Sequence, residues 1–193
     1  LHRIIERQYP VNAIYSVGLE KEESVDALED LPLKQKKRIR MFRGHMSHGV
    51  HYVLPGVFTY FTVLRDPVER VISYYHFIKR IETHYLHDHL CEDDVDLKSF
   101  VTNKTHVMID NAQTRIVSGA WHGPKFGTCG PTLLDEAKCN LQRDFAAVGL
   151  VERFDESLML FARLFGWQNL FYTRKNVSRR RPRRVEYSKD TIA

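Results

Sequence analysis

Arg65 and Ser73 are the first residues whose types and spacing indicate chemistry. Arg65 ends the apolar run "FTYFTVL", and Ser73 follows eight residues later in "RDPVERVIS". The planar guanidinium of arginine can bind a phosphate through two parallel hydrogen bonds. A helix that begins after Asp66 would add the N–H groups and the dipole of its N-terminus, which attract anions. These residues predict an anion site, whereas a salt bridge within the turn, beside a solvated serine, is the simpler alternative.

His45 is the second candidate, in the stretch "FRGHMSHGVHY". His45, His48 and His51 recur every three residues, but no carboxylate or cysteine joins them at ligand spacing, so we expect no metal site. Taken alone, His45 closes a predicted strand. Histidine has an ordinary pKa of about 6.5 and can remove a proton from a hydroxyl near neutral pH. An exposed loop histidine is the alternative.

The segment "DNAQTRIVSG", residues 110–119, carries the third group of polar residues. On a helix Asn111 and Arg115 lie four residues apart and share a face, with Gln113 between them along the chain. The residues alone fit a solvated polar face as well as a functional site.

The basic segment near the C-terminus has three possible roles. Seven of the eleven residues from Arg174 to Arg184 are Lys or Arg. Such a density of like charge favours a mobile loop until an anion binds. It fits a nucleic-acid patch, a solvated surface or a lid over a bound nucleotide. Tyr172 and Tyr187 are the only aromatics in residues 172–193, which disfavours single-stranded nucleic acid because its bases stack on aromatic side chains.

The elements that must position these residues alternate between strands and helices. The run from Phe58 to Leu64 is rich in aromatic and β-branched residues, as is typical of a strand buried in a parallel sheet. Asp66 is a good helix cap, Pro67 suits a first turn, and Glu69 completes a capping box. Further strands are predicted at 11–17, 38–45 and 146–152, helices at 22–31, 97–101, 108–118, 133–145 and 155–166, and a polar loop at 84–96. This order predicts an α/β fold in which ligands bind beyond the carboxyl ends of the strands.

Composition predicts one globular domain over residues 1–193, with 43% hydrophobic and 27% charged residues. The net charge of +5 predicts anionic partners. Three cysteines without CxxC spacing indicate neither a disulfide framework nor a zinc site. No apolar run approaches the ~20 residues that span a bilayer, so membrane contact would need a segment outside this chain. The chain starts without Met and stops where Ser188 begins a predicted helix, so we expect a fragment truncated at both ends.

The segment "LRDPVERVISYY" resembles the second nucleotide-binding motif of the sulfotransferases that use 3′-phosphoadenosine 5′-phosphosulfate, most closely the family that contains heparan sulfate 2-O-sulfotransferase. The resemblance extends from about Arg38 to the end. It implies a P-loop-NTPase-like three-layer sandwich with a central parallel sheet, whose first strand and 5′-phosphosulfate loop are missing from this sequence. It also implies that Arg65 and Ser73 bind the 3′-phosphate of the nucleotide and that His45 is the catalytic base.

Other positions follow from the same resemblance. Arg174 and Lys175 match an Arg-Lys pair that contacts the nucleotide in the heparan enzyme. Arg43 stands where that enzyme has a second histidine; this departure puts a uronic-acid acceptor in doubt, although Arg43 suits contact with an acidic substrate. The Asn-x-Gln-x-Arg pattern that contains Gln113 and Arg115 resembles one in bacterial relatives and implies substrate positioning.

The expected activity is transfer of a sulfuryl group from 3′-phosphoadenosine 5′-phosphosulfate, a co-substrate, to a hydroxyl of a glycan or another alcohol, without a metal. Two alternatives stay open. A nucleotide kinase-like phosphotransferase would need a complete Gly-Lys-Ser/Thr phosphate loop, which this sequence lacks. A non-catalytic polyanion-binding protein would use the basic segment alone. The sequence does not decide the compartment: a bacterial relative would be cytoplasmic, and an animal one would lie in the Golgi lumen.

Overall fold

The computed structural model describes residues 1–17, 25–104, 106–121, 123–173, 182, 184–188 and 191. The chain divides into two compact units. Unit 1 comprises Leu1–Leu64, Thr114–Gly123 and Gly130–Thr173, and unit 2 comprises Arg65–Gln113, Pro124–Cys129 and Arg174–Ala193. The single domain expected from composition stays a prediction.

Unit 1 contains two pairs of parallel strands. β1 (Ile14–Val17) pairs with β2 (Met41–Gly44), and β3 (Tyr60–Leu64) pairs with β4 (Phe145–Leu150). The β3–β4 register shifts between Tyr60 and Phe61. All four predicted strands are therefore confirmed. Each is shorter than predicted, and β4 begins one residue before its predicted start. A 3₁₀ turn, Val11–Ala13, occupies the first three residues of the predicted strand 11–17.

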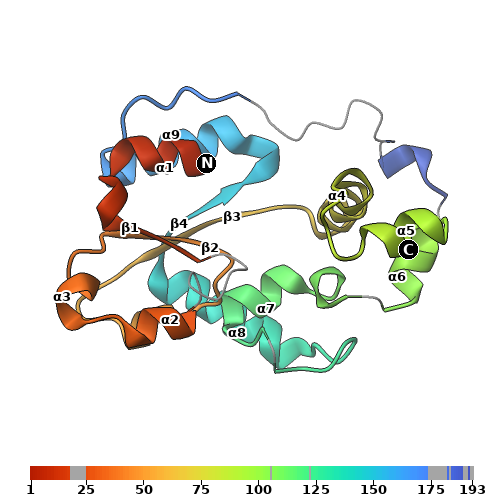
Figure 1. Ribbon diagram of the computed structural model, residues 1–193, viewed down its shortest axis with the longest axis horizontal. Coiled ribbons are helices and arrows are strands. Elements are labelled where there is room, and N and C mark those ends of the chain that lie inside the picture. The colour runs from red at the N-terminus through yellow and green to blue at the C-terminus, as the bar shows by residue number, and fades with distance from the viewer. Residues whose placement is uncertain are drawn as a thin grey trace. The chain divides into compact units, whose positions relative to one another are not determined.

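Helices cover both faces of these strands. In Figure 1 the strands of unit 1 lie between α1 and α9 on one side and α2 and α8 on the other. The helices are α1 (His2–Gln8), α2 (Val25–Asp30), α3 (Leu33–Lys36), α8 (Pro131–Asp144) and α9 (Phe154–Phe165), with 3₁₀ turns at Val50–Val53 and Val151–Arg153. This layered α/β arrangement with parallel strands confirms the predicted fold class.

The main core of unit 1 is aromatic. The ring of Phe61 on β3 lies 5.1 Å from that of Phe161, 5.2 Å from that of Phe165 and 5.4 Å from that of Trp167. The buried residues Ile4 and Ile5 of α1 belong to the same cluster. The indole N–H of Trp167 donates a hydrogen bond of 3.2 Å to the hydroxyl of Tyr9. Apolar burial of this kind is the main stabilising contribution to a fold of this size.

Unit 2 is helical. Its elements are α4 (Pro67–Arg80), α5 (His87–Glu92), α6 (Leu97–Thr102), the first residues of α7 (Ala112–Ser118), and 3₁₀ turns at Val107–Ile109 and Arg184–Glu186. The N–H of Glu69 donates to the Asp66 carboxylate at 2.9 Å, which confirms the predicted cap of α4. The apolar face of α4 packs against α5 and α6 through Ile72, Tyr75, Ile78, Leu90, Leu97 and Phe100.

The predicted polar loop at 84–96 is wrong, because α5 occupies its centre. Leu90, on α5, is completely buried in the core of unit 2, and Leu86 packs against the same cluster. Two leucines four residues apart supply an apolar helix face, although charged and histidine residues surround them in the sequence.

In the part of the chain that the structure describes, no helix is both long enough and apolar enough to cross a membrane.

Candidate functional site

The main chain of Arg65 is held by a side chain in unit 2. The N–H of Arg65 donates to Oε1 of Gln113, and Nε2 of Gln113 donates to the carbonyl of Arg65, both at 2.8 Å. The β3–β4 pairing ends one residue earlier, at Leu64. The side-chain amide of Gln113 therefore provides the main-chain N–H and carbonyl of Arg65 with the two hydrogen bonds that a neighbouring strand would otherwise make.

The guanidinium of Arg65 lies at the N-terminus of α4. Its Nη2 is 3.5 Å from Oε2 of Glu69 in the first turn of the helix, and both side chains are about a quarter exposed. Nη1 of Arg184 lies 3.6 Å from Oδ1 of the capping Asp66. These contacts are long for charge-assisted hydrogen bonds. An anionic ligand could therefore compete with either carboxylate for an arginine.

Two more polar residues lie on α4. Ser73 is half-buried in the second turn, and its side chain leans toward the N-terminus of the helix as helical side chains do. Arg70 donates from Nη1 to the carbonyl of Met108 at 2.7 Å. Burial lowers the pKa of Arg70, and the nearby charge of Arg65 lowers it further. The start of α4 thus combines three positive side chains with the positive end of the helix dipole.

His45, in unit 1, follows β2 directly and is exposed. Its N–H donates to the carbonyl of Val17 at 3.3 Å, which extends the β1–β2 pairing. Gly44 has a φ of +132°, and a Cβ there would lie 1.9 Å from the same carbonyl oxygen. Only glycine fits this backbone approach. The glycine before His45 therefore allows the strand to close against β1 while the imidazole faces solvent.

Arg43 is engaged within unit 1. Its Nε donates to Oγ of Ser16 at 3.0 Å, and its Nη1 lies 2.8 Å from Oε1 of Glu6 and 3.2 Å from the carbonyl of His2. The hydrogen bond from Arg43 lowers the pKa of Glu6. Burial, followed by the charge of Arg43, lowers the pKa of His2. The structure places Arg43 as a link between β2, β1 and α1, and its contact with a substrate stays a prediction.

The remaining predicted residues have different outcomes. Arg115 on α7 is completely buried, so a solvated face does not describe it. Asn111 has a φ of +52° and lies outside α7, which begins at Ala112, so the predicted helix face shared with Arg115 is wrong. Arg174 and Lys175 lie outside the described residues.

The structure thus brings some predicted residues together. Arg65 and Gln113 are in contact in unit 2, where Ser73 follows on α4. Arg43 and His45 flank Gly44 in unit 1. Among the residues that the structure describes, no three His, Cys, Asp or Glu side chains are grouped to hold a metal ion. That the reaction needs no metal stays a prediction.

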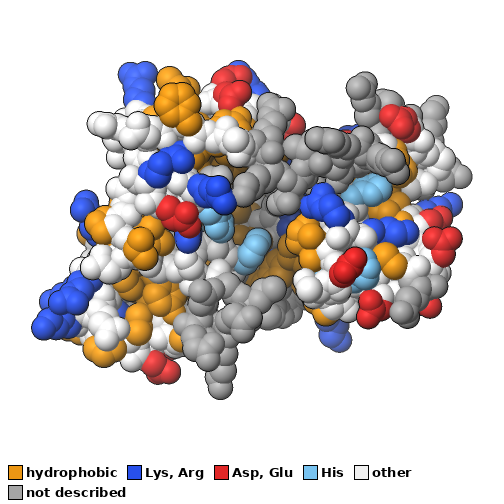
Figure 2. All heavy atoms as spheres, turned by 45° about the horizontal axis from the view of Figure 1, so that its top comes forward, with side chains coloured by type: hydrophobic (Ala, Val, Ile, Leu, Met, Phe, Trp, Pro, Cys, Tyr) orange, Lys and Arg blue, Asp and Glu red, His pale blue; other side chains and the backbone are white. Residues whose placement is uncertain are grey.

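Positive charge is concentrated in the basic segment. On the face drawn in Figure 2, Lys and Arg side chains are interspersed with Asp and Glu. Seven of the 29 basic residues fall between Arg174 and Arg184, and without them the 24 acidic residues would outnumber the other 22 basic ones. Attraction of anions by the whole molecule therefore depends on this segment, nearly all of which lies outside the described residues.

Three ion pairs of the structure are not among the contacts predicted from the sequence. The spacing of Arg65 and Glu69, four residues apart around a helix start, could have predicted their ion pair. Arg184 with Asp66, and His48 with Asp144, are distant in sequence, and no local pattern predicts them.

Comparison with known families gives one match. A sequence model described as the sulfotransferase family matches residues 15–191, which is most of the chain. No curated protein matches the chain at a significant level.

Proposed function

The chain belongs to the sulfotransferase family, and we propose on that premise that it moves the sulfuryl group of 3′-phosphoadenosine 5′-phosphosulfate to a hydroxyl of a glycan or other alcohol. Membership of the family gives sulfuryl transfer in general. The donor and the acceptor are the parts that we add. The observation that carries the donor is the arrangement at the start of α4, where Gln113 fixes the main chain of Arg65 beside the positive end of the helix dipole.

On this proposal Arg65 and Ser73 bind the 3′-phosphate in unit 2. A phosphate carries more charge than the Glu69 carboxylate and can accept two parallel hydrogen bonds from a guanidinium. The ion pair of 3.5 Å between Arg65 and Glu69 is partly exposed, and such pairs contribute little, so an arriving phosphate replaces it at small cost. Arg174 and Lys175 add further contacts to the nucleotide.

In unit 1, His45 acts as the general base. The acceptor hydroxyl forms a new bond from its oxygen to sulfur, while the bond between sulfur and the bridging phosphate oxygen breaks. The proton of the hydroxyl passes to the imidazole of His45, and adenosine 3′,5′-bisphosphate leaves with the bridging oxygen. Positive side chains stabilise the charge that develops on the leaving group.

The acceptor is proposed from charge alone. The basic segment and Arg43 suit an acidic glycan, with Gln113 and Arg115 positioning the residues around it. Arg43 already forms an ion pair with Glu6, so an acidic acceptor would have to share or replace that contact.

The donor assignment can be tested by calorimetry on the full-length protein. Adenosine 3′,5′-bisphosphate and 5′-AMP differ only in the 3′-phosphate, so their affinity ratio measures recognition of that group. Arg65→Ala should reduce the ratio by about 10- to 100-fold, the equivalent of ~1.5–3 kcal/mol for a charged hydrogen bond. Because Gln113 binds the main chain of Arg65, this variant keeps both Gln113 hydrogen bonds.

Arg163→Ala is the matched control, because Arg163 is exposed on α9 and the substitution removes one positive charge, as Arg65→Ala does. It should leave the ratio unchanged. If wild-type protein binds the bisphosphate no better than 5′-AMP, or if both arginine variants behave alike, the 3′-phosphate assignment is refuted.

A further inference from the structure

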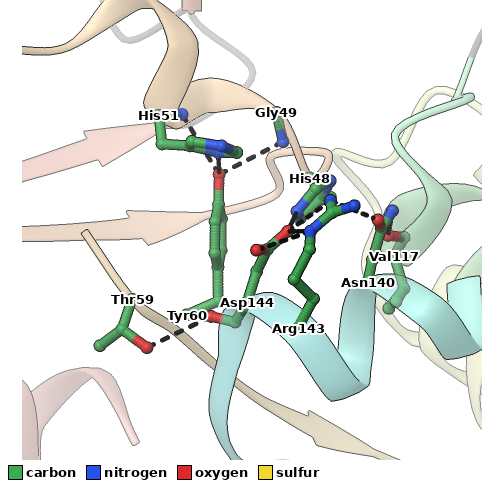
Figure 3. Close-up of polar contacts among 9 residues, drawn as sticks. All are labelled: His48, Gly49, His51, Thr59, Tyr60, Val117, Asn140, Arg143 and Asp144. Carbon is green, nitrogen blue, oxygen red and sulfur yellow. Dashed lines mark hydrogen bonds and ion pairs between the residues drawn. The ribbon is translucent and has the colours of Figure 1, made fainter. Parts of the chain in front are cut away.

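The loop that follows β2 is fastened to three other parts of unit 1. We call residues 45–54 the His45 loop; it begins at His45 and includes the 3₁₀ turn Val50–Val53. Figure 3 shows its contacts: His48 points toward Asp144 at the end of α8, and His51 and Gly49 surround the hydroxyl of Tyr60 on β3. These contacts have no role in the chemistry proposed above.

The first fastening is the pair of His48 and Asp144. Nε2 of His48 lies 2.7 Å from Oδ2 of Asp144, and the His48 side chain is only 5% exposed. The same carboxylate accepts hydrogen bonds of 2.8–3.1 Å from Arg143. Arg143 also donates to Oδ1 of the buried Asn140 at 2.9 Å. Asp144 is thus held by its own helix and presents one oxygen to the loop.

The second fastening is the hydroxyl of Tyr60. It accepts hydrogen bonds from the N–H groups of Gly49 and His51, both at 3.2 Å. It also lies 2.6 Å from Nδ1 of His51. A hydroxyl has two acceptor positions and one proton. With both acceptor positions occupied, Tyr60 donates its proton to Nδ1 of His51, so every hydrogen-bonding position of the hydroxyl is used.

The third fastening is main chain against main chain. The N–H of His48 donates to the carbonyl of Ile116 at 2.8 Å. Gly119, with a φ of +87°, comes so close that a Cβ there would lie 2.9 Å from the His48 carbonyl oxygen. Asn140 donates from Nδ2 to the carbonyl of Val117 at 3.1 Å, which holds the same stretch to α8. The loop is therefore fixed at both the side chain and the backbone of His48.

We propose that His48, Asp144 and Tyr60 are positioning residues that hold the His45 loop, and with it the imidazole of His45, for sulfuryl transfer. The catalytic part of this inference rests on the proposed function. His45 is exposed, directly follows β2 and lies only three residues before His48. Its backbone is therefore held by β2 on one side and by His48 on the other. A base must be held within hydrogen-bond reach of the hydroxyl that it deprotonates, so a misplacement of about 1 Å can cost 100-fold in rate.

The test compares three substitutions at two positions, His48 and Tyr60, in the full-length protein. His48→Leu removes the donor to Asp144 while keeping an apolar side chain of similar size. His48→Gln restores an N–H donor at a similar reach. We expect His48→Leu to lower kcat at least tenfold with KM for the donor changed less than twofold, and His48→Gln to recover most of that loss. Tyr60→Phe, which removes one hydroxyl, should give a smaller loss and serves if His48→Leu does not fold.

A second measurement needs no turnover. Amide hydrogen exchange across residues 45–54, followed by NMR, should become at least tenfold faster in His48→Leu and return toward the wild-type rate in His48→Gln. The matched control is His89→Leu, because His89 makes a similar contact with Asp93, 2.9 Å long, on the exposed surface of α5. It should change neither exchange in the loop nor kcat.

Unchanged exchange in the loop of both His48→Leu and Tyr60→Phe would overturn the inference, as would faster exchange with unchanged kcat. If the wild-type protein transfers no sulfuryl group, the proposed function fails, and exchange alone then decides whether these residues hold the loop.

Discussion

The His45 loop and the segment at Arg65 both begin at the carboxyl end of a parallel strand, but they are held in opposite ways. In the loop, the imidazoles of His48 and His51 are themselves hydrogen-bonded within unit 1, to Asp144 and to the hydroxyl of Tyr60, in addition to the main-chain contacts. Arg65 is fastened through its main chain by Gln113, while its guanidinium makes a 3.5 Å ion pair with Glu69. A fixed backbone with an exchangeable side-chain contact suits ligand binding.

The two regions also differ in how much their side chains can gain by binding a ligand. Side chains that are fully paired inside the protein gain little from a ligand, because each ligand contact would first break an internal hydrogen bond. The network around His48 therefore fits a positioning role, whereas the start of α4 fits a binding role.

The largest expected effect comes from Gly44→Ala. The new Cβ would lie 1.9 Å from the carbonyl oxygen of Val17 at a φ of +132°, so β1 and β2 must separate. We expect a loss of about 3 kcal/mol or more in the free energy of unfolding, measured in urea. Gly127→Ala is the control: Gly127 also has a positive φ, of +75°, but nothing lies near its Cβ position, so about 1 kcal/mol is expected. Equal losses would show that strand contact at Gly44 is unimportant.

A smaller effect is expected from Gln113→Ala. The substitution removes the hydrogen bonds that the Gln113 amide makes with the N–H and the carbonyl of Arg65. The free energy of unfolding should fall by about 1–3 kcal/mol. Affinity for adenosine 3′,5′-bisphosphate, measured by calorimetry, should fall roughly tenfold, because Arg65 loses its fixed backbone.

The chain offers a matched control for Gln113. Gln8 makes the same pair of hydrogen bonds with the main chain of Gln168, at 2.6 and 2.8 Å, in unit 1. Gln8→Ala should lower stability without changing affinity for the bisphosphate. If both variants lose affinity alike, the clamp at Arg65 has no special part in binding.

The smallest effect concerns acid stability. Hydrogen bonds from Arg143, and then from His48, lower the pKa of Asp144 to about 2, from about 4 in an unfolded chain. A lowered carboxyl pKa gives stability that is present above pH ~4 and is lost as pH falls toward 2. We expect the free energy of unfolding to drop across that window by at most about 1 kcal/mol from this group, because Arg143, the partner that lowers its pKa most, is more than half exposed. The same pH slope in Asp144→Asn would contradict the assignment.

Local patterns predicted the strands and the start of α4. The cap at Asp66 and the first-turn proline are encoded within four residues, and β3 is marked by a run of β-branched and aromatic residues, although its residues are only partly buried. The helix α5 was missed because its polar residues hide an apolar face of two leucines. In a segment this short, the intrinsic propensities for helix and loop differ little in free energy. The packing of Leu86 and Leu90 in unit 2 therefore determines that the segment is helical.

The candidate site could be predicted only where it depends on adjacent residues. Arg65, Ser73 and His45 follow from strand ends and residue type, and their roles stay predictions. The clamp of Gln113 joins residues 48 positions apart, and His48 meets Asp144 across 96. Such contacts depend on the packing of whole elements, so no spacing rule reveals them. The burial of Arg115 belongs to the same class.

Trp167 gives unit 1 its own optical reporter. Both tryptophans of the chain, Trp121 and Trp167, belong to unit 1, whereas the described aromatic side chains of unit 2 are tyrosine, phenylalanine and histidine. Trp167 is buried among the rings of Phe61, Phe161 and Phe165. Intrinsic fluorescence excited at the red edge of tryptophan absorption therefore follows the unit that carries His45, while the unit that carries Arg65 is silent in that signal.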